Sequence, residues 1–166
     1  MEFGALVCKP SSPNCENCVF KNNCYSFLNN KVYLFPRKKK NNTAKIRNFN
    51  FLVIKSSTNR TIIVKRTGND IWKNLYQFPL FETDGLSNKN DILHKLSKNK
   101  NFDLSVSKLN LYRNKIFINK LSHQHIHCSF WIVQVKKINK NYVNITDLSS
   151  YPFPKPISNF LIHYKW

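Results

Sequence analysis

Residues 49–54 read FNFLVI, and this stretch decides the fold of most of the chain. Every second residue, Phe49, Phe51 and Val53, would lie on one face of a β-strand, because side chains along a strand alternate between faces. A turn cluster at 56–59 (SSTN) separates it from a second apolar run at 61–65 (TIIVK). Two apolar runs joined by a short polar turn predict a β-hairpin.

Further elements follow on the C-terminal side of this hairpin. Residues 91–100 carry Ile92, Leu93 and Leu96 at helical spacing, with Asn88 or Asn90 available as the N-cap. Strands are expected at 109–112, 126–135 and 142–145, and a closing helix at 156–164 that has proline at its start. Strands interleaved with helices predict an α+β sandwich.

Four cysteines lie close together near the N-terminus, in the spacing C-x6-C-x2-C-x5-C: Cys8, Cys15, Cys18 and Cys24. Four thiolates in so short a stretch favour one all-cysteine iron–sulfur site. Structural zinc is an alternative, although such sites usually have two C-x2-C pairs and only one is present. Disulfides are another, but they need an oxidising compartment, and the apolar run at 1–7 is too short for a signal peptide.

The charge of the chain favours a polyanionic partner. Its 166 residues contain 27 Lys and Arg against 8 Asp and Glu, a formal net charge of +19. Nucleic acid is the usual partner of such a protein, although an AT-rich genome would account for part of the lysine content. A membrane partner is not expected, because no apolar run is long enough to cross a bilayer and no amphipathic basic helix is evident.

Three motifs, taken in order, resemble adenine DNA glycosylases of the MutY family. They are MEFGALVC at 1–8 with the cysteine loop that follows, DIWKNLYQFP at 70–79, and LSHQH at 121–125. The resemblance covers nearly the whole chain. It implies a [4Fe–4S] cluster on the four cysteines and a Nudix-like α+β domain with a mixed sheet and flanking helices. The implied organisation is a cluster loop at 1–28, a basic connector at 29–48 and a lesion-recognition domain at 49–166.

The resemblance also implies a reader of 8-oxoguanine opposite adenine in double-stranded DNA. Leu121, Ser122 and His123 match the family's Phe-Ser-His loop, with Leu121 in place of the phenylalanine that would wedge beside the lesion. The lesion carries a hydrogen on N7, so a reader must offer an acceptor there, and the Ser122 hydroxyl can accept. An ordinary strand-edge turn is the alternative interpretation of this short motif.

Contacts with the DNA backbone are expected from basic residues near the cluster. Lys9 and Lys21 lie inside the loop that the cluster would hold rigid, and the family's loop touches DNA. Arg37 and Lys38 begin a charged run in the connector that could follow the backbone, although such a run is usually only solvated.

Catalytic residues, by contrast, do not match. Glycosylase chemistry needs an acid and a carboxylate, which the family places with a helix-hairpin-helix upstream of the cluster, and no such motif is present. A Nudix pyrophosphatase needs several glutamates around a metal ion, and the chain has three glutamates, with Asp91 and Asn99 at the matching positions after Gly85. We therefore expect a C-terminal portion that works with a helical catalytic half, on the same or a separate chain. Met1 falls where the family has an internal methionine.

Two other functions stay open at this stage: a stand-alone DNA-binding module, and a remnant of a decaying gene. The family resemblance implies a cytoplasmic, nucleoid-associated location. His123, His125 and His127 alternate in a way that can bind zinc, although no nearby carboxylate supports them. Cys128 is expected to be a small buried side chain. Trp72 and Tyr76 are expected to anchor a core or an interface.

Overall fold

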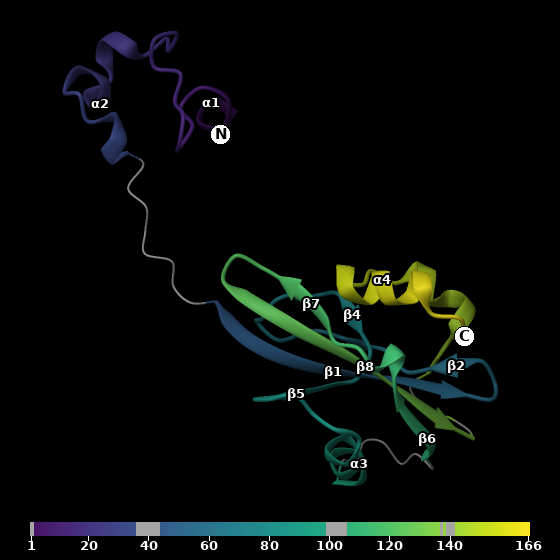
Figure 1. Ribbon diagram of the computed structural model, residues 1–166. Coiled ribbons are helices and arrows are strands. Elements are labelled where there is room, and N and C mark those ends of the chain that lie inside the picture. The colour runs from purple at the N-terminus through teal and green to yellow at the C-terminus, as the bar shows by residue number, and fades with distance from the viewer. Residues whose placement is uncertain (1, 36–43, 99–105, 137, 139–141) are drawn as a thin grey trace. The chain divides into compact units, whose positions relative to one another are not determined.

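The computed structural model describes residues 2–35, 44–98, 106–136, 138 and 142–166. The chain divides into two compact units, Met1–Asn42 and Thr43–Trp166 (Figure 1). Within the described ranges no helix has the length and apolar character that a membrane crossing requires.

The first unit contains short helical segments joined by turns. They are α1 (Glu2–Leu6), the 3-10 helix η1 (Lys21–Asn23), α2 (Tyr25–Leu28) and the 3-10 helix η2 (Val32–Leu34). None of the described residues in this unit is buried. Its local structure comes from turn hydrogen bonds, such as those from the Asn14 N–H to the Val7 carbonyl (2.9 Å) and from the Cys18 N–H to the Cys15 carbonyl (3.2 Å).

The second unit is built on a mixed five-stranded sheet. Its two long strands, β1 (Lys45–Ser56) and β8 (Gln124–Val135), run parallel in the register Lys45↔Gln124 to Ser56↔Val135. Shorter strands pair antiparallel beside them: β5 (Leu80–Thr83) on β1, and β6 (Val106–Leu111) and β7 (Phe117–Lys120) on β8. Two small ladders lie apart from this sheet. They pair β2 (Arg60–Thr61) with β9 (Val143–Asn144), and β3 (Val64–Lys65) with β4 (Tyr76–Gln77).

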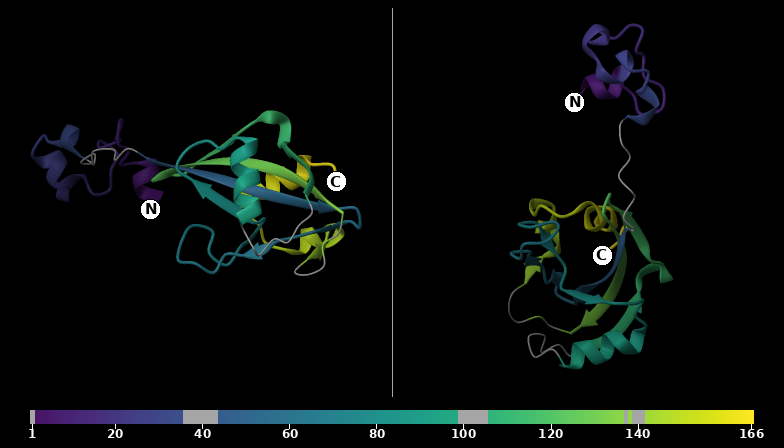
Figure 2. Two further views of the ribbon diagram at one scale, coloured as in Figure 1. Left: turned by 90° about the horizontal axis from the view of Figure 1, so that it is seen from below. Right: turned by 90° about the vertical axis from the view of Figure 1, so that its left-hand side faces the viewer.

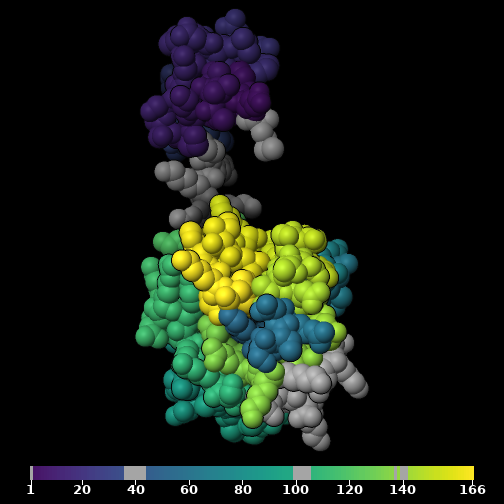
Figure 3. All heavy atoms as spheres, turned by 90° about the vertical axis from the view of Figure 1, so that its right-hand side faces the viewer, coloured from purple at the N-terminus to yellow at the C-terminus, as the bar shows by residue number. Residues whose placement is uncertain are grey.

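Helices cover both faces of the sheet, as the views in Figures 1 and 2 show. On one face α3 (Lys89–Lys98) buries Ile92 and Leu96 against Leu52 and Ile54 of β1. On the other face α4 (Lys155–His163) packs Phe160 into an apolar cluster with strands β1 and β8. The remaining 3-10 helices, η3 (Tyr112–Asn114) and η4 (Ile145–Ser150), follow β6 and β9. Figure 3 shows the C-terminal segment, in yellow, on the surface of this unit.

The predicted strand at 49–54 is confirmed. Its side chains are buried on both faces of the sheet, because each face is covered by a helix. Phe49, Phe51 and Val53 belong to the cluster under α4, whereas Leu52 and Ile54 belong to the cluster under α3. The predicted α+β class, a mixed sheet with flanking helices, is confirmed.

The predicted hairpin is wrong, because the apolar run at 61–65 does not pair with β1. The apolar run after the turn does not extend β1 into an antiparallel pair; Arg60–Thr61 pairs with β9, and Val64–Lys65 pairs with β4. The edges of β1 are occupied instead by β5 and β8, which come from distant parts of the sequence.

The two predicted helices are present. Asn88 caps α3, because its side-chain oxygen accepts the backbone N–H groups of Asn90 (2.8 Å) and Asp91 (3.0 Å). The Asp91 carboxylate accepts the N–H of Asn88 in return (2.8 Å). Leu93, however, is 37% exposed and contributes little to the core.

Candidate cluster site and nucleic-acid interface

The four N-terminal cysteines line one small cavity. Cys8 follows α1, Cys15 and Cys18 lie in the next turn, and Cys24 precedes α2. The cavity has a volume of about 30 Å³, and Val7, Pro13, Asn14, Lys21 and Phe27 complete its lining. None of the five cysteines forms a disulfide.

The thiols are close enough to affect one another electrostatically. Partial desolvation, followed by the proximity of Cys8, Cys18 and Cys24, raises the pKa of the Cys15 thiol above its ordinary value. Ionising all four thiols therefore needs a compensating positive charge at the centre of the group. One nearby cation is Lys21, whose ammonium group donates to the Glu16 carboxylate and lies 5.2 Å from the centroid of the Phe27 ring.

This donor set fits an iron–sulfur cluster. Soft thiolates are the usual ligands of such clusters, and four of them converge on one cavity. Among the described residues, no group of three or more His, Cys, Asp or Glu side chains is arranged to hold a single metal ion. A cluster of several irons binds each cysteine through a different iron, so its ligands need not approach one another as closely as the ligands of one zinc ion.

The second candidate site is the turn between β7 and β8. The Leu121 N–H donates to the Gln124 carbonyl at 2.8 Å and closes this turn. Leu121 is half-buried against the apolar cluster under α4, whereas Ser122 and His123 are exposed. The His123 carbonyl accepts the N–H of Lys45 at 3.3 Å, which ties the turn to the first residue of β1. In the described part of the chain the Ser122 hydroxyl has no hydrogen-bond partner and is available to a ligand.

The structure places the other residues singled out in the sequence as follows. Lys9 is exposed, and Arg37 and Lys38 lie outside the described residues. His125 and His127 lie on β8 but form no metal-ligand group with other described residues. Cys128 is buried in the core, where desolvation raises its pKa to about 12, as expected for an inert side chain.

Trp72 and Tyr76 are anchors, as predicted. Trp72 packs edge-on against Phe49, with ring centroids 5.9 Å apart, and Tyr76 packs edge-on against Tyr151 at 4.9 Å. Trp72 has a positive φ of 60°, which is rare for so large a side chain and marks a constrained loop between β3 and β4.

A charged network that the sequence did not reveal holds this loop. Both terminal nitrogens of Arg47 donate to the Asp70 carboxylate at 2.8 Å, and its Nε donates to Glu82 at 2.6 Å. Arg66 donates to Asp70 as well, also at 2.8 Å. These hydrogen bonds, with Arg47 the principal donor, lower the pKa of Asp70 to about 2 and lower the pKa of Glu82. Two of the few acidic side chains are thus paired with arginine.

Comparison with known proteins agrees with this fold. A family model described as the NUDIX domain matches residues 50–163. The MutT protein from Methanosarcina mazei Go1 has a similar structure, with a TM-score of 0.50 over 73% of this chain and 94% of that chain. The sequence identity is 9%, so this similarity shows the fold alone. The chain belongs to the NUDIX domain family.

Sequence relatives extend the similarity to the first unit. Adenine DNA glycosylases of Buchnera aphidicola, from the subspecies Baizongia pistaciae and Schizaphis graminum, are each 30% identical over 99% of this chain. The matched region is 46% and 47% of their lengths, so the chain spans about half of the curated relatives it matches. These matches confirm the resemblance to the C-terminal part of the MutY family.

Proposed function

We propose that this chain is the cluster-bearing and lesion-recognising portion of an A/G-specific adenine DNA glycosylase, acting in base excision repair in the cytoplasm at the nucleoid. The observation that carries the proposal is the similarity to adenine DNA glycosylases over 99% of the chain, which includes the cysteine unit as well as the NUDIX domain. A stand-alone NUDIX protein would need no cysteine unit.

In this proposal Cys8, Cys15, Cys18 and Cys24 bind a [4Fe–4S] cluster. The cluster would cross-link a unit in which no described residue is buried, and so would supply the stability that an apolar core supplies elsewhere. Lys9 and Lys21 would then be held in fixed positions from which they contact DNA phosphates. Arg37 and Lys38, which lie outside the described residues, are proposed to contact the backbone as well.

The turn at 121–123 would inspect the base opposite adenine. The exposed hydroxyl of Ser122 would accept the N7 hydrogen of 8-oxoguanine, which guanine lacks. His123 would donate or accept at the base edge or a phosphate. Leu121, held by the core on one side, would place the turn and present its remaining surface to the base step.

Bond cleavage would belong to a partner. The proposed partner is the helical catalytic half of the glycosylase, on the same or a separate chain, because no carboxylate pair of this chain matches the chemistry. Asp91, the only acidic residue of α3, is engaged in the helix cap. The NUDIX domain is therefore proposed to bind DNA and not to hydrolyse a diphosphate.

Duplex binding tests the proposal. The 166-residue chain should bind a duplex with 8-oxoguanine opposite adenine more tightly than the same duplex with guanine, both measured by fluorescence anisotropy at one fixed salt concentration. Ser122→Ala should lower this preference about ten-fold, because one hydrogen bond to the lesion is lost and the N7 hydrogen is left unpaired.

Ser149→Ala is the matched control, because Ser149 is also exposed and lies on η4, away from the turn. It should leave the preference unchanged. Equal affinity of the unmodified chain for the two duplexes would contradict the lesion-reading role.

A further inference from the structure

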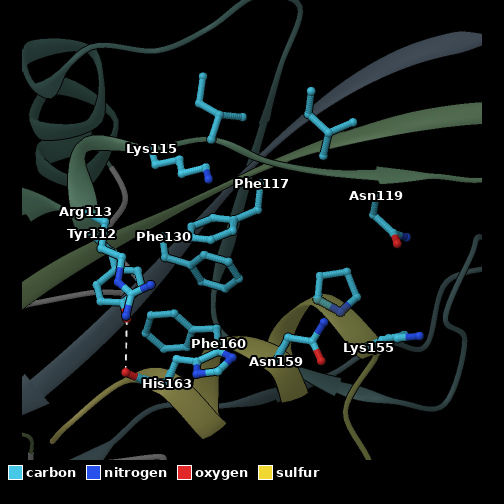
Figure 4. A pocket seen from close by; sticks show the side chains of 13 residues that line it. Tyr112, Arg113, Lys115, Phe117, Asn119, Phe130, Lys155, Asn159, Phe160 and His163 are labelled. Atoms are coloured by element: carbon cyan, nitrogen blue, oxygen red, sulfur yellow. Dashed lines mark hydrogen bonds between the residues drawn. The ribbon is translucent and has the colours of Figure 1, made fainter.

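A groove lies between α4 and the segment that joins β6 to β7 (Figure 4). It has a volume of about 650 Å³ and an aromatic floor that includes Phe117, Phe130 and Phe160. The rings of Phe130 and Phe160 are stacked with centroids 4.3 Å apart. The Tyr112 hydroxyl donates to the His163 carbonyl at 3.2 Å, which ties one wall to the other. The floor of the groove therefore belongs to the apolar core of this unit.

Basic side chains come from both walls of this groove. Arg113 and Lys115 belong to the β6–β7 connection, and Lys155 and His163 belong to α4. Figure 4 shows Arg113 and His163 toward one end of the groove and Lys155 toward the other. All four side chains are exposed.

The groove has no acidic counterpart. No carboxylate is among its lining residues in the described part of the chain, and Asp147 is the only acidic residue from position 104 to position 166. Among the described residues, neither Arg113 nor Lys115 has a side-chain hydrogen bond or an ion pair. Their charged groups lie 5.2 Å from the Tyr112 ring centroid and 6.0 Å from the Phe117 ring centroid, respectively. Their charge is thus available to an anion from solution.

The position of the groove connects it to the turn at 121–123. Strand β7 begins at Phe117 in the groove and ends at Lys120, one residue before Leu121. Leu121, Phe117 and Phe160 pack into the same apolar cluster, so the turn and the groove share one rigid support.

We propose that this groove binds the phosphodiester backbone of DNA next to the base inspected by the turn at 121–123. The ligand is an extended polyanion, because the cations are spread along both walls and a single phosphate would meet only one end. The amides of Asn119 and Asn159, which also line the groove, can hydrogen-bond to sugar or phosphate oxygens. The inference rests on the proposed function, since it assigns the DNA path on the same domain.

The double variant Lys115→Gln/Lys155→Gln tests the proposal by removing one cation from each wall. Its affinity for duplex DNA should fall about ten-fold or more at low salt. The slope of log affinity against log salt should become shallower by about 2, about 1 for each lost phosphate contact. The preference for 8-oxoguanine over guanine should not change, because backbone contacts carry no base information.

The matched control is Lys89→Gln/Lys98→Gln, which removes two exposed lysines from α3 on the opposite face of the sheet. It lowers the net charge equally, so it should reproduce only the smaller, non-local part of the effect. Tryptophan fluorescence of both variants, followed during urea unfolding, checks that the NUDIX domain is intact.

The experiments test the groove and the lesion-reading turn independently. Equal affinity and salt slope in the two double variants would overturn the groove, even if Ser122→Ala still lowers the lesion preference. Equal affinity of the unmodified chain for the two duplexes would overturn the proposed function. A shallower slope of log affinity against log salt in the groove variant would still support backbone binding. Competition by deoxyguanosine monophosphate, at concentrations where inorganic phosphate does not compete, would identify a mononucleotide pocket and overturn the backbone assignment.

Discussion

The two units of this chain are stabilised in different ways. Residues 2–35 contain no buried side chain, and many of their large apolar groups are exposed: Leu6, Val19, Phe20, Tyr25, Leu28, Tyr33 and Leu34. The second unit buries two apolar clusters, one on each face of its sheet. A unit without a core needs another source of stability, and we propose that a [4Fe–4S] cluster bound by the four thiols around one cavity supplies it. One short chain thus joins a unit without buried side chains, which we propose a cluster stabilises, to a unit held by apolar burial.

The largest effect is expected from removing one thiol. Cys15→Ser should abolish iron binding and unfold the first unit completely, because no buried side chain remains to hold it. The second unit should keep its stability. Iron content and visible absorbance report on the first unit. Tryptophan fluorescence reports on the second, because Trp72, Trp131 and Trp166 all belong to Thr43–Trp166.

The control for this variant is Cys128→Ser, since Cys128 is the only cysteine of the second unit. It should retain iron and lose some stability of the second unit, because a hydroxyl replaces a buried thiol. A single cooperative loss of iron and of tryptophan fluorescence in Cys15→Ser would show that the two units unfold together and are not stabilised separately.

A cavity in the core should destabilise the second unit and leave the first unit unchanged, the reverse of the result expected for Cys15→Ser. Phe130 is 1% exposed, and Phe130→Ala should lower the free energy of unfolding of the second unit by about 3–5 kcal/mol. Iron binding should persist. Urea unfolding followed by tryptophan fluorescence measures the change, and Phe130→Leu, with a smaller loss, keeps the test informative if the alanine variant does not fold.

Val19→Ala is the matching change in the first unit, where Val19 is 82% exposed. It should alter neither iron binding nor stability by more than about 0.5 kcal/mol. Loss of iron in this variant would reveal an apolar surface that supports the cluster site, and the contrast between the units would then be wrong.

The sequence predicted those features that depend on neighbouring residues. The cysteine spacing predicted that four cysteines lie close together, the alternation at 49–54 predicted a strand, and Asn88 was one of the two predicted caps of α3. Burial on both faces of that strand was not predicted, because it depends on helices elsewhere in the chain. The turn at 121–123 was found through family resemblance, because three residues carry too little information alone.

Features that join distant residues were missed. The partner of β1 is β8, about 80 residues away in the register Lys45↔Gln124, and no local pattern distinguishes that pairing from a hairpin. The Arg47 network was missed for the same reason, because it joins three separate segments. The groove was also missed, because its basic residues come from η3, from the loop between η3 and β7, and from α4. A large excess of basic residues does not show which of them face one another.

The charged network at Asp70, which belongs to the second unit alone, is expected to contribute least to stability. The pKa of Asp70 is about 2 in the folded chain, below its ordinary value of 3.8, because Arg47 and Arg66 bind the ionised carboxylate. A depressed folded-state pKa gives stability that is present above the unfolded value and is lost as the pH falls toward 2. The side chain is 37% exposed, so screening limits this contribution to about 1 kcal/mol.

Asp70→Asn should therefore destabilise the second unit by about 1 kcal/mol at pH 7, and the difference from the unmodified chain should vanish between pH 4 and about pH 2. Urea unfolding followed by tryptophan fluorescence measures this even where acid has removed the iron, because the fluorescence comes from the second unit alone. Asp84→Asn is the control, since the exposed Asp84 side chain has no ion-pair partner among the described residues, and its effect should stay within about 0.5 kcal/mol. A difference between Asp70→Asn and the unmodified chain that persists unchanged down to pH 2 would mean that Asp70 acts through packing. The loop that carries Trp72 would then be held by the aromatic contact with Phe49 and not by charge.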